Sequence, residues 1–199
     1  MSELINGGKM FIFTAPSGAG KTTIVRHLLE KYDFLDFSIS ATTRQRRPHE
    51  VDGKDYYFLS VEEFDEKIAN DEFVEWEVVY EDKYGTLKSE IDRVWELGKH
   101  VVFDIEVKGA TNIKKMYGDK CKAIFIKPPS LEILIERLTN RKTESDSSLR
   151  KRIARVKREM KYQYTFDGVL VNDLLEVALK EAEFFVETFI HGKPFEEEE

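Results

Sequence analysis

The segment Ala15–Thr22, which reads APSGAGKT, has the residue types of a loop that binds nucleotide phosphates. Glycines let successive backbone N–H groups turn toward phosphate oxygens, and the lysine adds a cation for the same oxygens. Lys21 would then reach the β- and γ-phosphates, and the hydroxyl of Thr22 would ligate Mg²⁺. Ala15 stands where the usual pattern has its first glycine. The alternative is a glycine turn that carries Gly-Lys-Thr by chance.

The position of this loop between an apolar run and a helix-like segment favours the phosphate site. Such a loop does not by itself distinguish hydrolysis of a nucleoside triphosphate from transfer of its phosphoryl group. The residues that this loop would place around the nucleotide phosphates are Ala15, Pro16, Ser17, Gly18, Ala19, Gly20, Lys21, Thr22 and Thr23.

A second anion site is indicated by Arg44 and Arg47, three residues apart in the segment SATTRQRRP. Guanidinium groups bind phosphate oxygens through two parallel hydrogen bonds, so a pair of arginines can hold a dianionic monophosphate. A basic turn exposed to solvent explains the same spacing. The residues alone leave both interpretations open.

Glu75 lies between Val74 and Trp76 in an apolar segment, where a carboxylate is unusual unless it has partners. Guanine offers adjacent N1–H and N2–H₂ donors, and one carboxylate can accept hydrogen bonds from both. Adenine lacks this donor pair, so a buried glutamate would be left unsatisfied beside it. The alternative is a glutamate that faces outward from an alternating strand, and it too stays open.

The elements that would position these residues alternate between strand and helix. The apolar run Met10–Thr14 predicts a buried strand, and the spacing of apolar residues after the loop predicts a helix over 21–32. Alternating strands and helices predict a parallel sheet that is covered on both faces. Further strands are expected at 100–107, 121–129 and 168–172, with helices at 130–140, where Ser130 is the N-cap, and at 174–190.

Two segments interrupt this alternation. Residues 37–85 predict a strand-rich insertion, with strands at 37–43, 55–59 and 72–80 and a helix-like stretch at 60–71. The polar segment RKTESDSS precedes a long charged helix expected over 148–162.

Size and composition narrow the class of protein. A chain of 199 residues fits one domain, and its single cysteine, Cys121, cannot form an intramolecular disulfide and fits a reducing compartment. The net charge of −7 makes nucleic acid an unfavourable partner. No apolar run approaches the ~20 residues of a membrane span, and the first residues do not resemble a signal peptide. We therefore expect a cytoplasmic protein without a membrane partner.

Six segments in order resemble guanylate kinases over almost the whole chain: APSGAGKTT, SISATTRQRRPHEVDGKDYYFLSVEEF, EFVEWEVVYEDKYGT, VVFDIEVKGA, AIFIKPPS and RLTNRKTES. The resemblance implies transfer of the γ-phosphoryl group of ATP to GMP, with Mg²⁺, in purine nucleotide metabolism. It implies no obligate protein partner. The implied fold is a single α/β domain over 1–199, with a three-layer α/β/α P-loop core and a parallel sheet. The core would comprise 1–36, 87–136 and 163–199, the GMP-binding insertion about 37–86, and a short lid about 137–162.

The resemblance also implies roles for individual residues. Arg44 and Arg47 would hold the GMP phosphate, and Tyr56 and Tyr84 would donate their hydroxyls to it. Glu75 would bind N1 and N2 of guanine, and Ser40 and Thr86 would contact the base. Asp104 has two possible roles, because the general P-loop pattern places a carboxylate there that assists Mg²⁺ and the family pattern places it beside guanine. The implied lid arginines are Arg137, Arg141 and Arg152, with Arg141 at ATP, and the implied catalytic set is Lys21, Arg44, Arg137 and Arg152.

Two residues depart from the family pattern. Arg46 stands at the place of a proline and His49 at the place of a common glycine, while the spacing of Arg44 and Arg47 is kept. We therefore expect a changed loop shape and the same phosphate site. Two other functions stay open: a kinase for another nucleoside monophosphate, and a non-catalytic guanylate-kinase-like module that binds proteins. The intact sequence Gly20-Lys21-Thr22 argues against the second.

Overall fold

The computed structural model describes residues 8–139 and 146–192, with side chains of the second range described from residue 150 onward. Its centre is a parallel five-stranded sheet in the order β2-β7-β1-β8-β9. The strands are β1 (Met10–Thr14), β2 (Leu35–Phe37), β7 (His100–Asp104), β8 (Cys121–Lys127) and β9 (Gly168–Val171). The predicted parallel sheet is confirmed, and β7 is shorter than expected because helix α4 begins at Val107.

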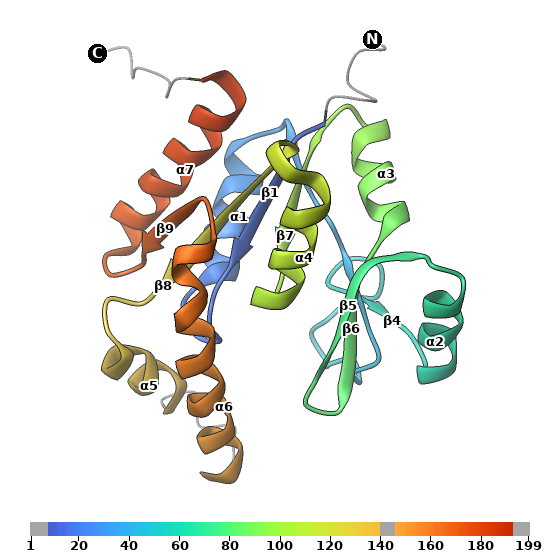
Figure 1. Ribbon diagram of the computed structural model, residues 1–199, viewed down its shortest axis with the longest axis horizontal. Coiled ribbons are helices and arrows are strands. Elements are labelled where there is room, and N and C mark those ends of the chain that lie inside the picture. Colours follow the sequence, from blue (N-terminus) through green and yellow to red (C-terminus); the bar gives the residue numbers. More distant parts are fainter. Residues whose placement is uncertain (1–7, 140–145, 193–199) are drawn as a thin grey trace.

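Helices cover both faces of this sheet, which gives the predicted three layers (Figure 1). Side chains of a strand alternate between faces, so Phe11 and Phe13 of β1 pack toward α1 and α7, while Met10 and Ile12 pack toward α3 and α4. The helices are α1 (Lys21–Lys31), α3 (Lys88–Glu96), α4 (Val107–Tyr117) and α7 (Leu175–His191). The sequence did not predict α3.

A second sheet, in the order β4-β3-β6-β5, lies beside the core. Its strands are β3 (Ser40–Thr42), β4 (Tyr57–Phe58), β5 (Phe73–Val79) and β6 (Asp82–Leu87), and α2 (Val61–Ala69) packs against it. Ser60 caps α2 in a capping box with Glu63. The single strand predicted over 37–43 is wrong, because this stretch is divided between β2 of the core sheet and β3 of the second sheet.

The remaining helices and the second sheet lie at the same end of the core, at the lower left and lower right of Figure 1. They are α5 (Leu131–Thr139) and α6 (Asp146–Glu159), followed by the 3₁₀ turn η2 (Met160–Thr165); a shorter turn, η1 (Gly118–Lys120), follows α4. The predicted N-cap of α5 is confirmed, since Ile133 N donates to Ser130 Oγ at 3.2 Å. No helix within the described ranges has both the length and the apolar character needed to cross a membrane.

Candidate active site

The predicted phosphate loop connects the central strand β1 to the first turn of α1. Gly18 and Gly20 have φ angles of +90° and +92°, a backbone region that residues with a Cβ rarely adopt. Among the described residues, the non-glycine positions with positive φ are Asp71 and Tyr80. Ala15 therefore occupies the first position of the loop without the strain that a left-handed alanine would bring.

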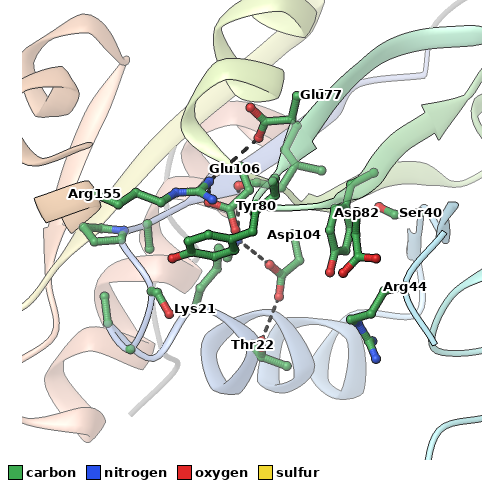
Figure 2. A pocket seen from close by; sticks show the side chains of 18 of the residues that line it. Lys21, Thr22, Ser40, Arg44, Glu77, Tyr80, Asp82, Asp104, Glu106 and Arg155 are labelled. Carbon is green, nitrogen blue, oxygen red and sulfur yellow. Dashed lines mark hydrogen bonds and ion pairs between the residues drawn. The ribbon is translucent and has the colours of Figure 1, made fainter. Parts of the chain in front are cut away.

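Lys21, at the start of α1, is held at the end of β7 (Figure 2). Its Nζ lies 2.6 Å from Asp104 Oδ1 and donates to the carbonyl oxygen of Ile105 at 3.1 Å. Burial lowers the pKa of Lys21, but the charges of Asp104 and Glu106 outweigh it, and the net pKa is raised. Lys21 thus stays cationic and keeps a fixed position beside the loop.

The other oxygen of Asp104 accepts a hydrogen bond from the Thr22 hydroxyl at 2.9 Å. A carboxylate and a hydroxyl are hard oxygen donors of the kind that Mg²⁺ prefers, and Mg²⁺ in kinase sites takes few protein ligands beside the phosphates. Thr22 and Asp104 therefore fit a Mg²⁺ ion bound with a nucleotide. This contact pattern favours the first of the two roles considered for Asp104.

The arginine site is organised by Glu50, a buried residue that sequence reasoning missed. Arg44 Nη2 donates to Glu50 Oε1 at 2.7 Å, and the backbone N–H of Arg47 donates to Glu50 Oε2 at 2.8 Å. The hydrogen bond from Arg44 is the main cause of the lowered pKa of Glu50. Arg44 also lies over the ring of Tyr56, with its guanidinium carbon 5.4 Å from the ring centroid. These contacts fix Arg44, whereas the side chain of Arg47 stays 59% exposed.

The two departures from the family pattern lie on the outer side of this loop. Arg46 and His49 are both exposed, and Arg46 Nη1 donates to the carbonyl oxygen of Glu50 at 3.4 Å. Arg44 is in contact with Glu50 beside them, and the changed loop shape stays a prediction.

Glu75 points inward, which decides between the two interpretations of its strand. The pairing of β5 with β6 shifts register between Phe73 and Glu75, so Phe73, Val74 and Glu75 are all buried while Trp76 is exposed. A bulge of this kind re-aims a side chain that simple alternation would place on the other face. The outward-facing alternative for Glu75 is therefore wrong.

The carboxyl group of Glu75 lies in a tight, buried site between β6 and α4. It accepts a hydrogen bond from Thr86 Oγ1 at 2.7 Å, and burial raises its pKa to about 7. Gly109 of α4 permits this position, because a Cβ on that residue would lie 2.6 Å from Glu75 Oε2. The carboxylate is thus confined between β6 and α4, with room for hydrogen-bond donors only on the side of the cavity described next.

One cavity of about 520 Å³ joins these groups. It is lined by the phosphate loop, the arginine site and Glu75. Figure 2 shows Lys21 on one side of Asp104 and Arg44 on the other. The predicted site residues that line it are Ala15, Pro16, Ser17, Gly18, Ala19, Gly20, Lys21, Thr22, Thr23, Ser40, Arg44, Arg47, Tyr56, Glu75, Tyr84, Asp104 and Arg152.

Two predicted residues within the described ranges, Thr86 and Arg137, do not line the cavity. Thr86 is fully buried behind Glu75. Arg137 donates from both terminal nitrogens to the carbonyl oxygen of Asn172, at 3.3 and 3.4 Å, and Asn172 in turn donates to Ala19 O of the phosphate loop at 2.8 Å. Arg141 lies outside the described residues. A catalytic role for Arg137 and an ATP contact for Arg141 stay predictions.

Several residues of the cavity were not predicted from the sequence. Glu77 lies two residues after Glu75, a spacing that places strand side chains on one face. Arg155 lies three residues after Arg152, a spacing that makes helix side chains neighbours. Either spacing could have been used to predict these residues from the sequence. The other polar residues missed in the cavity are Tyr80, Asp82 and Glu106.

A parallel α/β sheet with a phosphate loop after its central strand, facing a second anion site across one cavity, defines a P-loop kinase. The sequence model of the family described as guanylate kinase matches residues 7–189. The chain belongs to the guanylate kinase family. It is 47% identical over 185 residues to a guanylate kinase of Bacteroides thetaiotaomicron, covering 92% of this chain and 91% of that one. It is 44% identical over 183 residues to one of Chlorobium chlorochromatii, covering 92% and 96%.

A solved structure agrees with this assignment. The crystal structure of guanylate kinase from Anaplasma phagocytophilum superposes with a TM-score of 0.74 at 27% sequence identity. The match covers 92% of this chain and 87% of that chain. The likeness therefore extends over the core and the second sheet together.

Proposed function

We propose that this protein transfers the γ-phosphoryl group of ATP to GMP, giving ADP and GDP. The observation that carries the proposal is the shared cavity, which is lined by Lys21 of the phosphate loop, by Arg44 and by the buried residue Glu75. A protein that only hydrolysed its nucleotide would not need a second anion site joined to a buried acceptor of base hydrogen bonds. The family membership supports the same reaction.

The chemistry follows from which groups are charged. A phosphate oxygen of GMP is already an anion, so it can attack the γ-phosphorus while the bond to the bridging oxygen of ADP breaks, and no general base is required. The residues need only align the two nucleotides and neutralise charge. Lys21 would bind the transferring phosphoryl group, Arg44 and Arg47 would hold the GMP phosphate with Tyr56 and Tyr84, and Arg152 would approach from α6.

Base recognition would rest on Glu75, with Ser40 at the edge of the cavity and Thr86 holding the carboxylate from behind. Thr22 and Asp104 would hold Mg²⁺, which when bound with ATP neutralises phosphate charge. We also propose the division into a core, a GMP-binding insertion at about 37–86 and a lid at about 137–162. A place in cytoplasmic purine nucleotide metabolism suits these substrates.

The proposal is tested by ADP release measured with Mg²⁺ and ATP against GMP, AMP, CMP, UMP and dTMP in turn. We expect GMP to give a kcat/KM at least about a hundredfold above the others, since the site would leave Glu75 unsatisfied beside any base without the guanine donor pair. A preference for another monophosphate would reassign the base pocket. No release with any of them, together with tight binding of a protein partner, would favour the non-catalytic module.

Arg44→Ala is expected to raise the Kd of GMP about 10- to 100-fold, because a charge-assisted hydrogen bond to phosphate is worth ~1.5–3 kcal/mol. The Kd of ATP should change less than about twofold. Isothermal titration with each nucleotide measures both constants. Arg46→Ala is the matched control, since Arg46 is exposed in the same loop, and it should leave both constants near their original values. An Arg44→Ala protein with unchanged GMP affinity would count against the phosphate site.

A further inference from the structure

Arg155 of α6 lies among carboxylates that come from three different elements. Its Nη2 donates to Glu106 Oε2 at 2.9 Å and its Nε donates to Glu159 Oε1 at 2.5 Å. Nη2 also lies 3.9 Å from Glu77 Oε1, and the guanidinium carbon lies 5.8 Å from the ring centroid of Tyr80. Figure 2 shows Arg155 pointing toward both Glu77 and Glu106. One side chain of α6 therefore contacts strand β5, the turn after it and the residue before α4.

The carboxylates around Arg155 depend on its positive charge for compensation. Burial raises the pKa of Glu77 and of Glu159, and the charge of Glu106 adds to both shifts. Glu77 Oε1 and Glu159 Oε2 are buried and accept no hydrogen bond from any described residue. Burial lowers the pKa of Arg155, but Glu106, Glu159 and Glu77 outweigh it, so the guanidinium stays charged. Removal of this cation would leave three carboxylates close together with less compensation.

The position of α6 matters because of Arg152, which lies three residues before Arg155 on the same helix and lines the cavity with Lys21. Residues three apart are neighbours on a helix surface. Contacts that fix Arg155 thus also fix how close Arg152 comes to the phosphate loop.

We propose that Arg155 is a positioning residue for phosphoryl transfer: it holds α6 against Glu77 of the second sheet and Glu106 of the core, and so places Arg152 at the phosphate loop. The proposal rests on the proposed function. Without Arg155, α6 is held less firmly and water reaches the γ-phosphoryl group more often. Water then takes the place of GMP as the attacking oxygen and gives ADP and inorganic phosphate.

The test replaces Arg155 by methionine, which keeps the length of the side chain and removes its charge. We expect kcat for GDP formation to fall about tenfold, while the KM of GMP changes less than about threefold. The ratio of inorganic phosphate released to GDP formed should rise several-fold. Arg150→Met is the matched control, because Arg150 is an exposed arginine of the same helix, and it should keep kcat within about twofold.

Two further variants separate a positioning role from loss of fold. Arg155→Lys keeps the charge and should recover part of kcat, and Glu77→Gln should lower kcat in the original protein but add little in the Arg155→Met protein. If Arg155→Met does not fold, the two single variants decide the question: Glu77→Gln in the original protein should lower kcat and raise the ratio of phosphate to GDP, and Arg155→Lys should keep part of kcat. An unchanged kcat and phosphate-to-GDP ratio, an equal loss in Arg150→Met, or additive losses with Glu77→Gln would overturn the proposal. Failure of the original protein to release ADP with GMP would instead overturn the proposed function.

Discussion

Replacing Lys21 by alanine is expected to lower kcat with GMP about a thousandfold while the protein stays folded. Lys21 sits at the start of α1, where the backbone N–H groups and the helix dipole already favour phosphate, and its ammonium adds a full charge where the transition state concentrates negative charge. Removal of one such fixed electrostatic group costs about 10²–10³ in rate in other enzymes. The 2.6 Å contact with Asp104 places the ammonium before substrate binds, so little reorganisation is needed.

The measurement is single-turnover GDP formation at saturating Mg²⁺-ATP and GMP, with thermal unfolding as the check on folding. Lys31→Ala is the matched control: it removes a lysine from the last turn of the same helix, where Lys31 pairs with Glu183 and is 42% exposed. Its kcat should stay within about twofold of the original. If Lys21→Ala kept the full rate, the phosphate loop would have no part in the transfer.

The core sheet could be predicted from sequence where local signals agree. The strand Met10–Thr14 was predicted with its observed bounds, because a fully apolar run meets a glycine-rich loop that ends it. The division of residues 37–43 between two sheets could not be predicted, because it depends on partners far along the chain. Ser38 N donates to Val102 O at 3.0 Å in the core, and two residues later Ser40 pairs with Thr86 in the second sheet. No local pattern reports that change of sheet.

Helix α3 was missed for a related reason. Its sequence KSEIDRVWE is mostly polar, and its N-cap, Leu87, makes no side-chain cap. Its fully buried apolar residues are two, Ile91 and Val94, and the partly buried Trp95 packs beside them. The helix is stabilised by packing on the sheet, which local propensity does not show.

The residues of the site also differ in whether local sequence could predict them. The phosphate loop and the arginine pair are contiguous segments, so their spacing carries the prediction. The direction of Glu75 required the bulge in β5, which is set by pairing with β6. Glu50 was missed because its role comes from burial inside its own loop. The spacing of Arg155 from Arg152 was a usable signal for its helix face, but its partners are distant in sequence; Arg155 and Glu106 are 49 residues apart. Contacts of that range leave no periodicity in the sequence.

Replacing Glu75 by glutamine is expected to lower kcat/KM for GMP about a hundredfold. The guanine edge presents two donors, and two charge-assisted hydrogen bonds of ~1.5–3 kcal/mol each are at stake. The Thr86 hydroxyl donates to Oε1 of the carboxylate. A glutamine that kept this bond through its amide oxygen would turn its NH₂ group toward guanine and set donor against donor. Steady-state kinetics with GMP measures the loss. Glu72→Gln is the control, since Glu72 lies just before the same strand and its side chain, 40% exposed, pairs with Lys67.

The pH dependence of GMP binding tests the same residue independently. Burial raises the pKa of Glu75 to about 7 in the free protein, so the carboxyl group is protonated below that pH and offers guanine one acceptor fewer. GMP affinity should therefore rise with pH through about 7 and level off above it. The GMP phosphate also titrates, with a second pKa near ~6, and Glu75→Gln keeps only that contribution. Subtracting the variant's titration from the original's isolates Glu75, and two parallel pH profiles would remove this carboxylate from base recognition.

The raised pKa of Glu75 also affects stability, and its effect on the free energy of unfolding runs opposite to its effect on GMP affinity as pH rises. Between the ordinary glutamate pKa of 4.5 and about 7, the folded protein holds a proton on Glu75 that the unfolded chain has released. The free energy of unfolding without nucleotide should therefore fall as pH rises through that window, and Glu75→Gln should lose this part of the pH dependence. Saturating GMP should abolish this slope, because the bound carboxyl group is ionised in that window, as it is in the unfolded chain. The ionised carboxylate of Glu75 destabilises the folded protein until guanine binds, and only a base with two adjacent donors removes this cost. This dependence is what would make Glu75 selective.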